Sequence, residues 1–241
     1  MSEQEITQTV APPEPVGPPR RDAVGRSPAH HLHAARGARF RREGPFEVVA
    51  TYGDLEAERR ATRDGLAIAD VTGRRMVDVR GPIDEILGRL PLAPDLRRAR
   101  ISSRWAILIS APDSGDTYLR AAEASASPLG MATDATSLYA SFRLAGPRAG
   151  DLLARLTAFD VRSLEAGAAT GTQLAKISAI LIAIPAGDGV GRGYDVLVPS
   201  EYGRYAFETL LQAAHGLDAR PCGWDALVPA SAGADRRGGT A

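Results

Sequence analysis

A unit made of a strand, a Gly-Pro pair and a helix occurs twice in this 241-residue chain and limits its fold more than any other feature. Residues 75–80 alternate between apolar and polar side chains, as a half-buried strand does. Gly81-Pro82 ends that strand, and apolar residues then follow at helical spacing. Residues 139–144 and Gly146-Pro147 repeat the arrangement, with proline again at a position that the first turn of a helix tolerates. The repeat predicts a duplicated α+β fold.

Each unit is followed by a segment typical of a β-hairpin. In the first unit, residues 105–110 and 117–121 are predicted strands, and the residues between them favour a turn. In the second unit the predicted strands are 172–185 and 194–198, and the first of them contains an apolar run typical of a strand buried on both faces. Amphipathic helices are predicted at 54–64 and 201–214. We therefore expect antiparallel sheets with packed helices.

The two ends of the chain differ in composition from the part between them. Residues 1–29 contain six prolines and almost no large apolar side chains, so they bury too little surface to offset the entropy lost on ordering. Residues 229–241 are dominated by small and charged residues. We expect both segments to be disordered tails, and residues 30–228 to form one domain.

The overall composition excludes several classes of protein. The formal net charge is zero, from 29 basic and 29 acidic residues, which gives no electrostatic reason to bind nucleic acid. The single cysteine, Cys222, excludes an internal disulfide. No apolar run is long enough to cross a bilayer, and the N-terminus lacks the pattern of a signal peptide. We therefore expect a cytoplasmic protein that binds neither nucleic acid nor a membrane.

Five stretches, taken in order, resemble the glycine-cleavage T-protein, which is a folate-dependent aminomethyltransferase. The longest is 193–223, which reads as a Gly-Tyr-Asp strand, a proline, an amphipathic helix and a Cys-Gly loop. Residues 37–40 resemble the family's Gly-Ala-Arg opening, and residues 58–72 resemble its Asp-Val-Ser block. Residues 77–81 and 144–147 resemble its two strands that end in a glycine turn. The resemblance implies the folate-binding-domain fold of the T-protein. In that family a barrel domain follows, and we expect this C-terminal barrel to be lacking here.

The resemblance also indicates where the functional side chains of the family would stand. The catalytic Asp falls at Trp105 or Ala106, and residues 96–112 contain no Asp or Glu. A carboxylate is needed at that position to steer proton transfer. The pterin-binding Glu falls at Gly191, three residues after Asp188. As a hypothesis, the Trp105 indole plugs what would otherwise be a pterin pocket.

Two further positions depart from the family. Its Asn aligns near Glu123, and residues 225–229 replace an Arg-bearing segment that follows the Cys-Gly loop. We therefore predict that this chain has no catalytic residue and no metal site, and we leave its cofactor-binding residues unassigned.

The departures fit a related group, the gamma subunit of heterotetrameric sarcosine oxidase. Residues 159–162 and 172–177 resemble segments of that subunit. This resemblance implies a non-catalytic subunit that carries no cofactor itself. Its partners would be larger subunits of an amine-oxidising complex that hold flavin and tetrahydrofolate. Two alternatives stay open: a stand-alone tetrahydrofolate-dependent aminomethyl- or methyltransferase with a rearranged site, and a non-enzymatic protein that binds a small molecule.

Three other candidate sites have structural interpretations. His30, His31 and His33 lack a Cys or an acid at ligand spacing, so we interpret them as a solvated junction between the tail and the domain. The glycines of 187–193 precede a strand rather than a helix, so they predict a hairpin turn and not a dinucleotide site. Cys222 is predicted to be a small buried residue.

Overall fold

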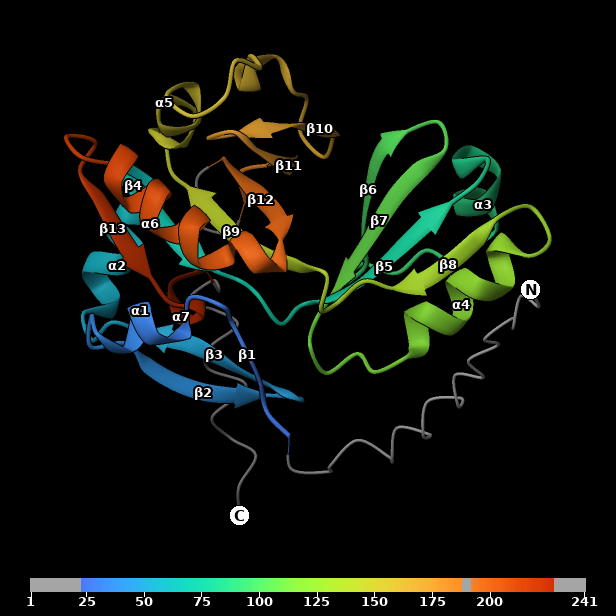
Figure 1. The fold of residues 1–241 in the computed structure, drawn as a ribbon, viewed down its shortest axis with the longest axis horizontal. Coiled ribbons are helices and arrows are strands. Elements are labelled where there is room, and N and C mark those ends of the chain that lie inside the picture. Colours follow the sequence, from blue (N-terminus) through green and yellow to red (C-terminus); the bar gives the residue numbers. More distant parts are fainter. Residues whose placement is uncertain (1–22, 188–191, 228–241) are drawn as a thin grey trace, which may run out of the picture.

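The two repeated units form the two main sheets of the computed structural model, which describes residues 23–187 and 192–227 (Figure 1). The first unit is β5 (Arg75–Arg80), α3 (Ile83–Arg89), β6 (Arg97–Ser102), β7 (Trp105–Ser110), α4 (Thr117–Ala126) and β8 (Met131–Asp134). These strands form a four-stranded antiparallel sheet in the order β6-β7-β5-β8. A βαββαβ chain with this strand order is a ferredoxin-like unit.

The second unit repeats this plan with additions. It consists of β9 (Tyr139–Ala145), α5 (Ala149–Ala154), a short 3-10 turn (Val161–Ser163), β10 (Ala169–Leu174), β11 (Ile177–Ile184), β12 (Gly193–Pro199), a second 3-10 turn (Ser200–Tyr202), α6 (Gly203–Ala213) and β13 (Ala219–Cys222). Its six-stranded sheet has the order β10-β11-β12-β9-β4-β13. The additions are β10 at one edge and β4 (Leu66–Asp70), which lies between β9 and β13. The predicted duplicated α+β fold is confirmed.

A third, smaller sheet is built from the N-terminal part of the chain. It contains β1 (Gly25–Arg26), β2 (Arg39–Glu43) and β3 (Phe46–Thr51), and α1 (His30–Ala34) follows β1. Residues 1–22 and 228–241, where most of the two predicted tails fall, lie outside the described residues. Residues 23–29 belong to the fold, because β1 pairs with β3 and Ala29 is fully buried. The predicted domain start at residue 30 is therefore too late.

The predicted first hairpin was wrong about its second strand. Residues 117–121 lie in α4, and the partner of β7 is β6, which precedes it. Two side chains of α4, Tyr118 and Ala122, pack against the four-stranded sheet one helical turn apart. β6 was not predicted because four of its six residues are Arg or Ser and mask its alternation.

The predicted strand at 172–185 is two strands. β10 and β11 are joined at Ala175 and Lys176, which have φ values of 46° and 71°. Both residues are in the left-handed region that a tight type I′ hairpin turn requires. Glycine or asparagine signals such a turn in a sequence, and neither is present here.

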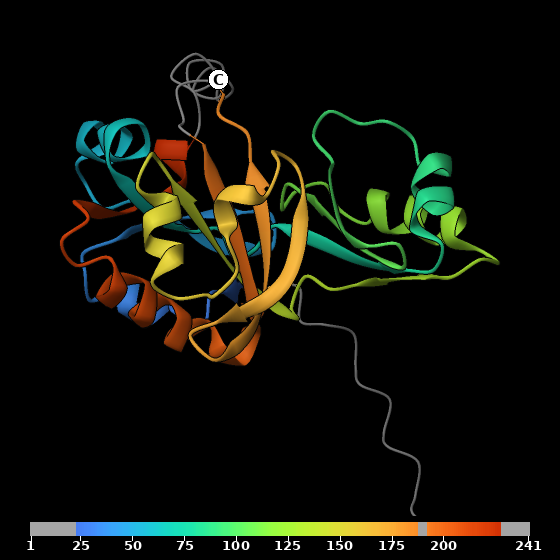
Figure 2. The same ribbon diagram turned by 90° about the horizontal axis from the view of Figure 1, so that it is seen from above.

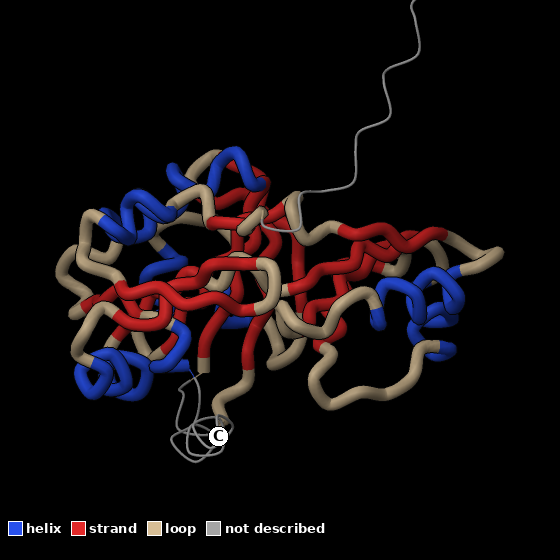
Figure 3. Tube along the Cα trace, turned by 90° about the horizontal axis from the view of Figure 1, so that it is seen from below, coloured by secondary structure: helices blue, strands red, loops and turns tan. Residues whose placement is uncertain are grey.

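The two main sheets face each other, and the helices lie on their outer sides (Figures 2 and 3). Helices α3 and α4 cover the four-stranded sheet, and α5 and α6 cover the six-stranded sheet. Between the sheets lies an apolar layer that we call the inter-sheet layer: Met76, Ala99, Ile107, Ile109, Ala135, Ile180, Ile182, Ile184 and Leu197. β11 thus has one face toward the inter-sheet layer and one toward the helix-covered core, which explains its nearly continuous apolar sequence.

Glu58, on α2 (Leu55–Asp64), ties the two ends of the domain together. Its side chain is fully buried and accepts hydrogen bonds from Thr51 Oγ1 at 2.6 Å, Tyr52 N at 2.8 Å and Gly223 N at 2.8 Å. A Cβ on Gly223 would lie 2.0 Å from the Ala50 carbonyl oxygen, so this close approach requires glycine. Helix α7 (Trp224–Leu227) then packs beside α2.

Glu58→Ala should destabilise the protein by about 3 kcal/mol, because it leaves three donors without an acceptor, two of them backbone N–H groups. Urea unfolding followed by circular dichroism measures the change. Glu56→Ala on the same helix is the matched control, since Glu56 is 69% exposed and should change stability by less than about 0.5 kcal/mol. Equal stability of the two variants would contradict this role of Glu58.

Candidate functional site

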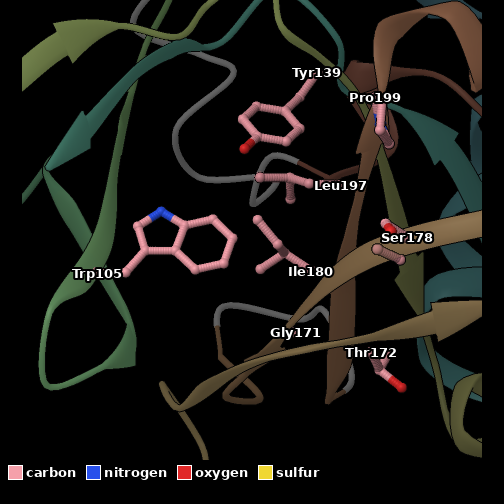
Figure 4. Close-up of a pocket in the computed structure, with 9 residues that line it drawn as sticks. Trp105, Tyr139, Gly171, Thr172, Ser178, Ile180, Leu197 and Pro199 are labelled. Carbon is pink, nitrogen blue, oxygen red and sulfur yellow. The ribbon is translucent and has the colours of Figure 1, made fainter. Parts of the chain in front are cut away.

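A groove of about 440 Å³ opens between the two main sheets (Figure 4). Trp105 of β7 forms one wall and faces Ile180 and Leu197 of the six-stranded sheet, with Tyr139 beside them. The remaining lining residues are Gly171, Thr172, Ser178, Ala179 and Pro199. Its volume is in the range of small-molecule sites. We call it the inter-sheet groove.

The Trp105 side chain is held in place by two charged neighbours. Its indole Nε1 donates to Asp78 Oδ2 at 3.0 Å, and the Arg80 guanidinium lies 4.1 Å from the centre of the ring. Arg80 also donates to both carboxylate oxygens of Asp78, at 2.6 and 3.1 Å. These contacts hold the Trp105 indole in position at one side of the groove. The groove remains open beside the indole, which lines it and does not fill it. The hypothesis that Trp105 plugs a pterin pocket stays a prediction.

The lining of the groove offers aromatic and aliphatic surface and a few hydroxyl groups. Among the described residues that line it, none is an acid, a histidine, a lysine or a cysteine. Burial raises the pKa of the Tyr139 phenol, and the nearby Asp78 carboxylate raises it further. The phenol therefore stays protonated at neutral pH. Such walls suit a flat apolar molecule and offer no group for acid–base catalysis near pH 7.

The structure does not bring the other predicted site positions to this groove. Ala106 points to the opposite face of its strand, toward α3 and α4. Glu123 is exposed on α4, and Asp225 on α7 pairs with Arg41. Gly191 and Asp188 lie outside the described residues.

Two carboxylates close to the predicted catalytic position were missed. Asp78 lies behind Trp105 on β5, on the inward face that it shares with Met76, and the alternation of residues 75–80 could have indicated this. Asp95 lies two residues before β6 and one residue before the acid-free stretch 96–112. Its carboxylate accepts a 2.5 Å hydrogen bond from the Tyr118 hydroxyl, and Tyr118 packs with α4 on the side away from the groove.

An ionic cluster joins the two main sheets away from the groove. Asp195 of β12 is fully buried and accepts hydrogen bonds at Oδ2 from Arg74 at 2.9 Å, Arg97 at 3.0 Å and Arg143 at 2.9 Å. Arg143 also bonds to Oδ1. Burial by itself would raise the pKa of Asp195, but the guanidinium groups, Arg143 foremost, outweigh it and hold the pKa well below its usual range.

The three histidines have separate surroundings. His33 is 1% exposed, with Nε2 2.8 Å from Asp70 Oδ2 and Nδ1 2.6 Å from the Tyr52 hydroxyl, so the predicted solvated junction was wrong for this residue. His30 lies beside Glu47, and His31 is exposed. Within residues 23–187 and 192–227, no group of three or more His, Cys, Asp or Glu side chains is placed to bind a metal ion.

Two smaller predictions are confirmed. Cys222 is fully buried, and burial raises the pKa of its thiol to about 12. The glycine-rich segment joins β11 to β12, which pair antiparallel from Ile184 and Gly193 onward, so the connection is a hairpin.

In the described part of the chain, no helix has the length and apolar character needed to cross a membrane.

Comparisons with known proteins agree with the fold. The sequence pattern of the family described as the GCVT N-terminal domain matches residues 94–229. Glycine cleavage system aminomethyltransferase T from Bartonella henselae has a similar structure, with a TM-score of 0.66 and 17% identity over 84% of this chain. This chain spans 60% of the length of that protein.

A second solved structure is also similar. It is a chain of heterotetrameric sarcosine oxidase from Corynebacterium sp. U-96, with a TM-score of 0.54 and 16% identity. The match covers 75% of this chain and 97% of that one. No curated protein sequence matches the chain.

The fold and the sequence match together define an α+β protein of the T-protein type. Because the family match covers more than half of the sequence, the chain belongs to the GCVT N-terminal domain family.

Asp195→Asn should destabilise the protein by about 3–5 kcal/mol at pH 7, because it leaves three largely buried guanidinium groups without a carboxylate. The folded-state pKa of Asp195 is depressed, so its contribution is complete above the unfolded pKa of about 4 and is lost as the pH falls toward the folded value. The stability difference between wild type and variant, measured by urea unfolding, should therefore shrink only below about pH 4.

The matched control for Asp195 is Asp84→Asn. The Asp84 side chain is 76% exposed in its pair with Arg100, so its loss should change stability by less than about 1 kcal/mol. If Asp195→Asn were as mild as Asp84→Asn, the ionic cluster would not hold the sheets together.

Trp105→Phe tests what positions the wall of the groove. Phenylalanine keeps a ring beside Arg80 but lacks the N–H that Asp78 accepts, so stability should fall by about 1–2 kcal/mol. Asp78→Asn in the same background should then add less than it does alone, because the two residues share one interaction. Full additivity in this double-mutant cycle would show that the indole N–H does not hold Asp78.

Proposed function

We propose that this chain is a non-catalytic subunit, similar to the sarcosine oxidase gamma subunit, of a heteromeric amine-oxidising complex in one-carbon metabolism. The observation that carries the proposal is the chemistry of the inter-sheet groove, where the described lining residues include no acid or base for proton transfer near pH 7. The Asp78 carboxylate beside Trp105 already accepts hydrogen bonds from Trp105 and Arg80.

The structural comparison supports the same proposal. The match extends over 97% of a chain of heterotetrameric sarcosine oxidase, so almost the whole of that chain has a counterpart here. In the proposed complex, larger partner subunits carry the flavin and the tetrahydrofolate, and this chain carries neither. The complex would act in the cytoplasm.

One observation favours the alternative of a stand-alone aminomethyl- or methyltransferase. The groove beside Trp105 is open and has a volume of about 440 Å³, so a pterin-sized molecule is not excluded by size. The described lining residues include two aromatic rings and no ionisable group other than a phenol, which would also serve a protein that only binds a small molecule.

Co-purification separates these functions. The full chain, tagged and expressed in its own host, should bring down larger subunits and a yellow flavin absorbance that elute with it on a sizing column. The same tag on an unrelated protein is the control. If the chain elutes alone, the subunit proposal fails.

Calorimetry on the isolated full chain distinguishes the two alternatives. The subunit proposal expects no tight binding of tetrahydrofolate by this chain alone. Tight binding that is lost in Trp105→Ala would place the folate in the groove and favour the transferase. A chain that elutes alone and does not bind tetrahydrofolate would favour a binding protein with another ligand.

A further inference from the structure

The ionic cluster between the sheets contains more positive than negative charge. Three guanidinium groups converge on the single carboxylate of Asp195, which leaves an excess of two positive charges. The side chains of Arg74 and Arg143 are only 12% and 13% exposed. The next carboxylate that acts on Arg74 is Asp70, and its oxygens already accept from Ser27, His33 and Thr72.

The excess positive charge of this largely buried cluster is energetically unfavourable. Each ion removed from water loses several kcal/mol of solvation, and only a partner of opposite charge recovers this loss. Burial lowers the pKa of Arg97 to about 10, and repulsion from Arg143 and Arg74 contributes to the shift. Arg97 is still protonated at neutral pH, so the positive charge remains.

The cluster also has donors that the described residues do not use. Arg74 Nε is buried and has no hydrogen-bond partner, although both of its terminal nitrogens are bonded, to Asp195 and Ser141. Arg97 uses only Nη1, and its side chain is 34% exposed, more than that of any other member of the cluster. Arg97 therefore forms the accessible side of the cluster.

We propose that Arg97 and Arg74 form a binding site for a small oxyanion, a carboxylate or a phosphate group. An oxyanion offers two or more acceptor oxygens, which match the paired N–H groups of a guanidinium. It would supply the negative charge that Asp195 alone does not provide. The site is distinct from the inter-sheet groove, because none of the three arginines lines that groove. It does not depend on the proposed subunit role.

Thermal unfolding of the full chain in different sodium salts tests the site. Inorganic phosphate and acetate are each compared with chloride at equal ionic strength. A bound anion stabilises the folded state by an amount that grows with its concentration, so at least one oxyanion should raise the Tm above that in chloride. A rise with acetate identifies the carboxylate as the ligand group, and a rise with phosphate alone identifies the phosphate group.

Arg97→Gln should abolish the extra rise in Tm. Arg100→Gln should keep it, because Arg100 lies on the same strand but pairs with the exposed Asp84. If Arg97→Gln does not fold, Arg97→Lys replaces it and should weaken anion binding roughly tenfold, the equivalent of one lost charge-assisted hydrogen bond. No extra rise in wild type, or an equal rise in the Arg97 and Arg100 variants, would overturn the proposal.

Discussion

Asp195 is the interaction on which the arrangement of the two main sheets depends. Its carboxylate lies on β12 of the six-stranded sheet and receives Arg97 from β6 of the four-stranded sheet. Arg143 comes from the neighbouring β9, and Arg74 comes from the connection between β4 and β5. Apolar packing between the sheets has no preferred direction, whereas a carboxylate bonded to three guanidinium groups fixes one relative position.

The groove and the ionic cluster occupy different parts of the space between the two main sheets. Along β12, Leu197 lines the groove and Asp195, two residues earlier on the same face, lies in the cluster. Along β9, Tyr139 lines the groove and Arg143 lies in the cluster. The space between the sheets is therefore apolar and aromatic at one end and carries the excess positive charge of the cluster at the other.

Much of the fold was predictable because it rests on local patterns. Examples are the Gly-Pro pairs, the alternation in 75–80 and the apolar run of β11. Each of these patterns depends only on residues that are close together in the sequence. The prediction errors arose where contacts between residues far apart in the sequence determine the local structure. Arg-rich β6 is a strand because it pairs with β7, and the Ala175-Lys176 turn is held by the strands on either side. The ionic cluster could not be predicted, since Arg74, Arg97, Arg143 and Asp195 are far apart in the sequence.

The position of β4 has a consequence for how this chain is made. All strands of the four-stranded sheet lie between residues 75 and 134, so that sheet is complete soon after its residues leave the ribosome. β4 is synthesised before it, but β4 pairs with β9 and with β13, where Leu66 stands opposite Ala219. Such long-range pairing is slow because a large loop must close first. We therefore expect β4 to remain unpaired on the nascent chain while the four-stranded sheet, which follows it in the sequence, forms.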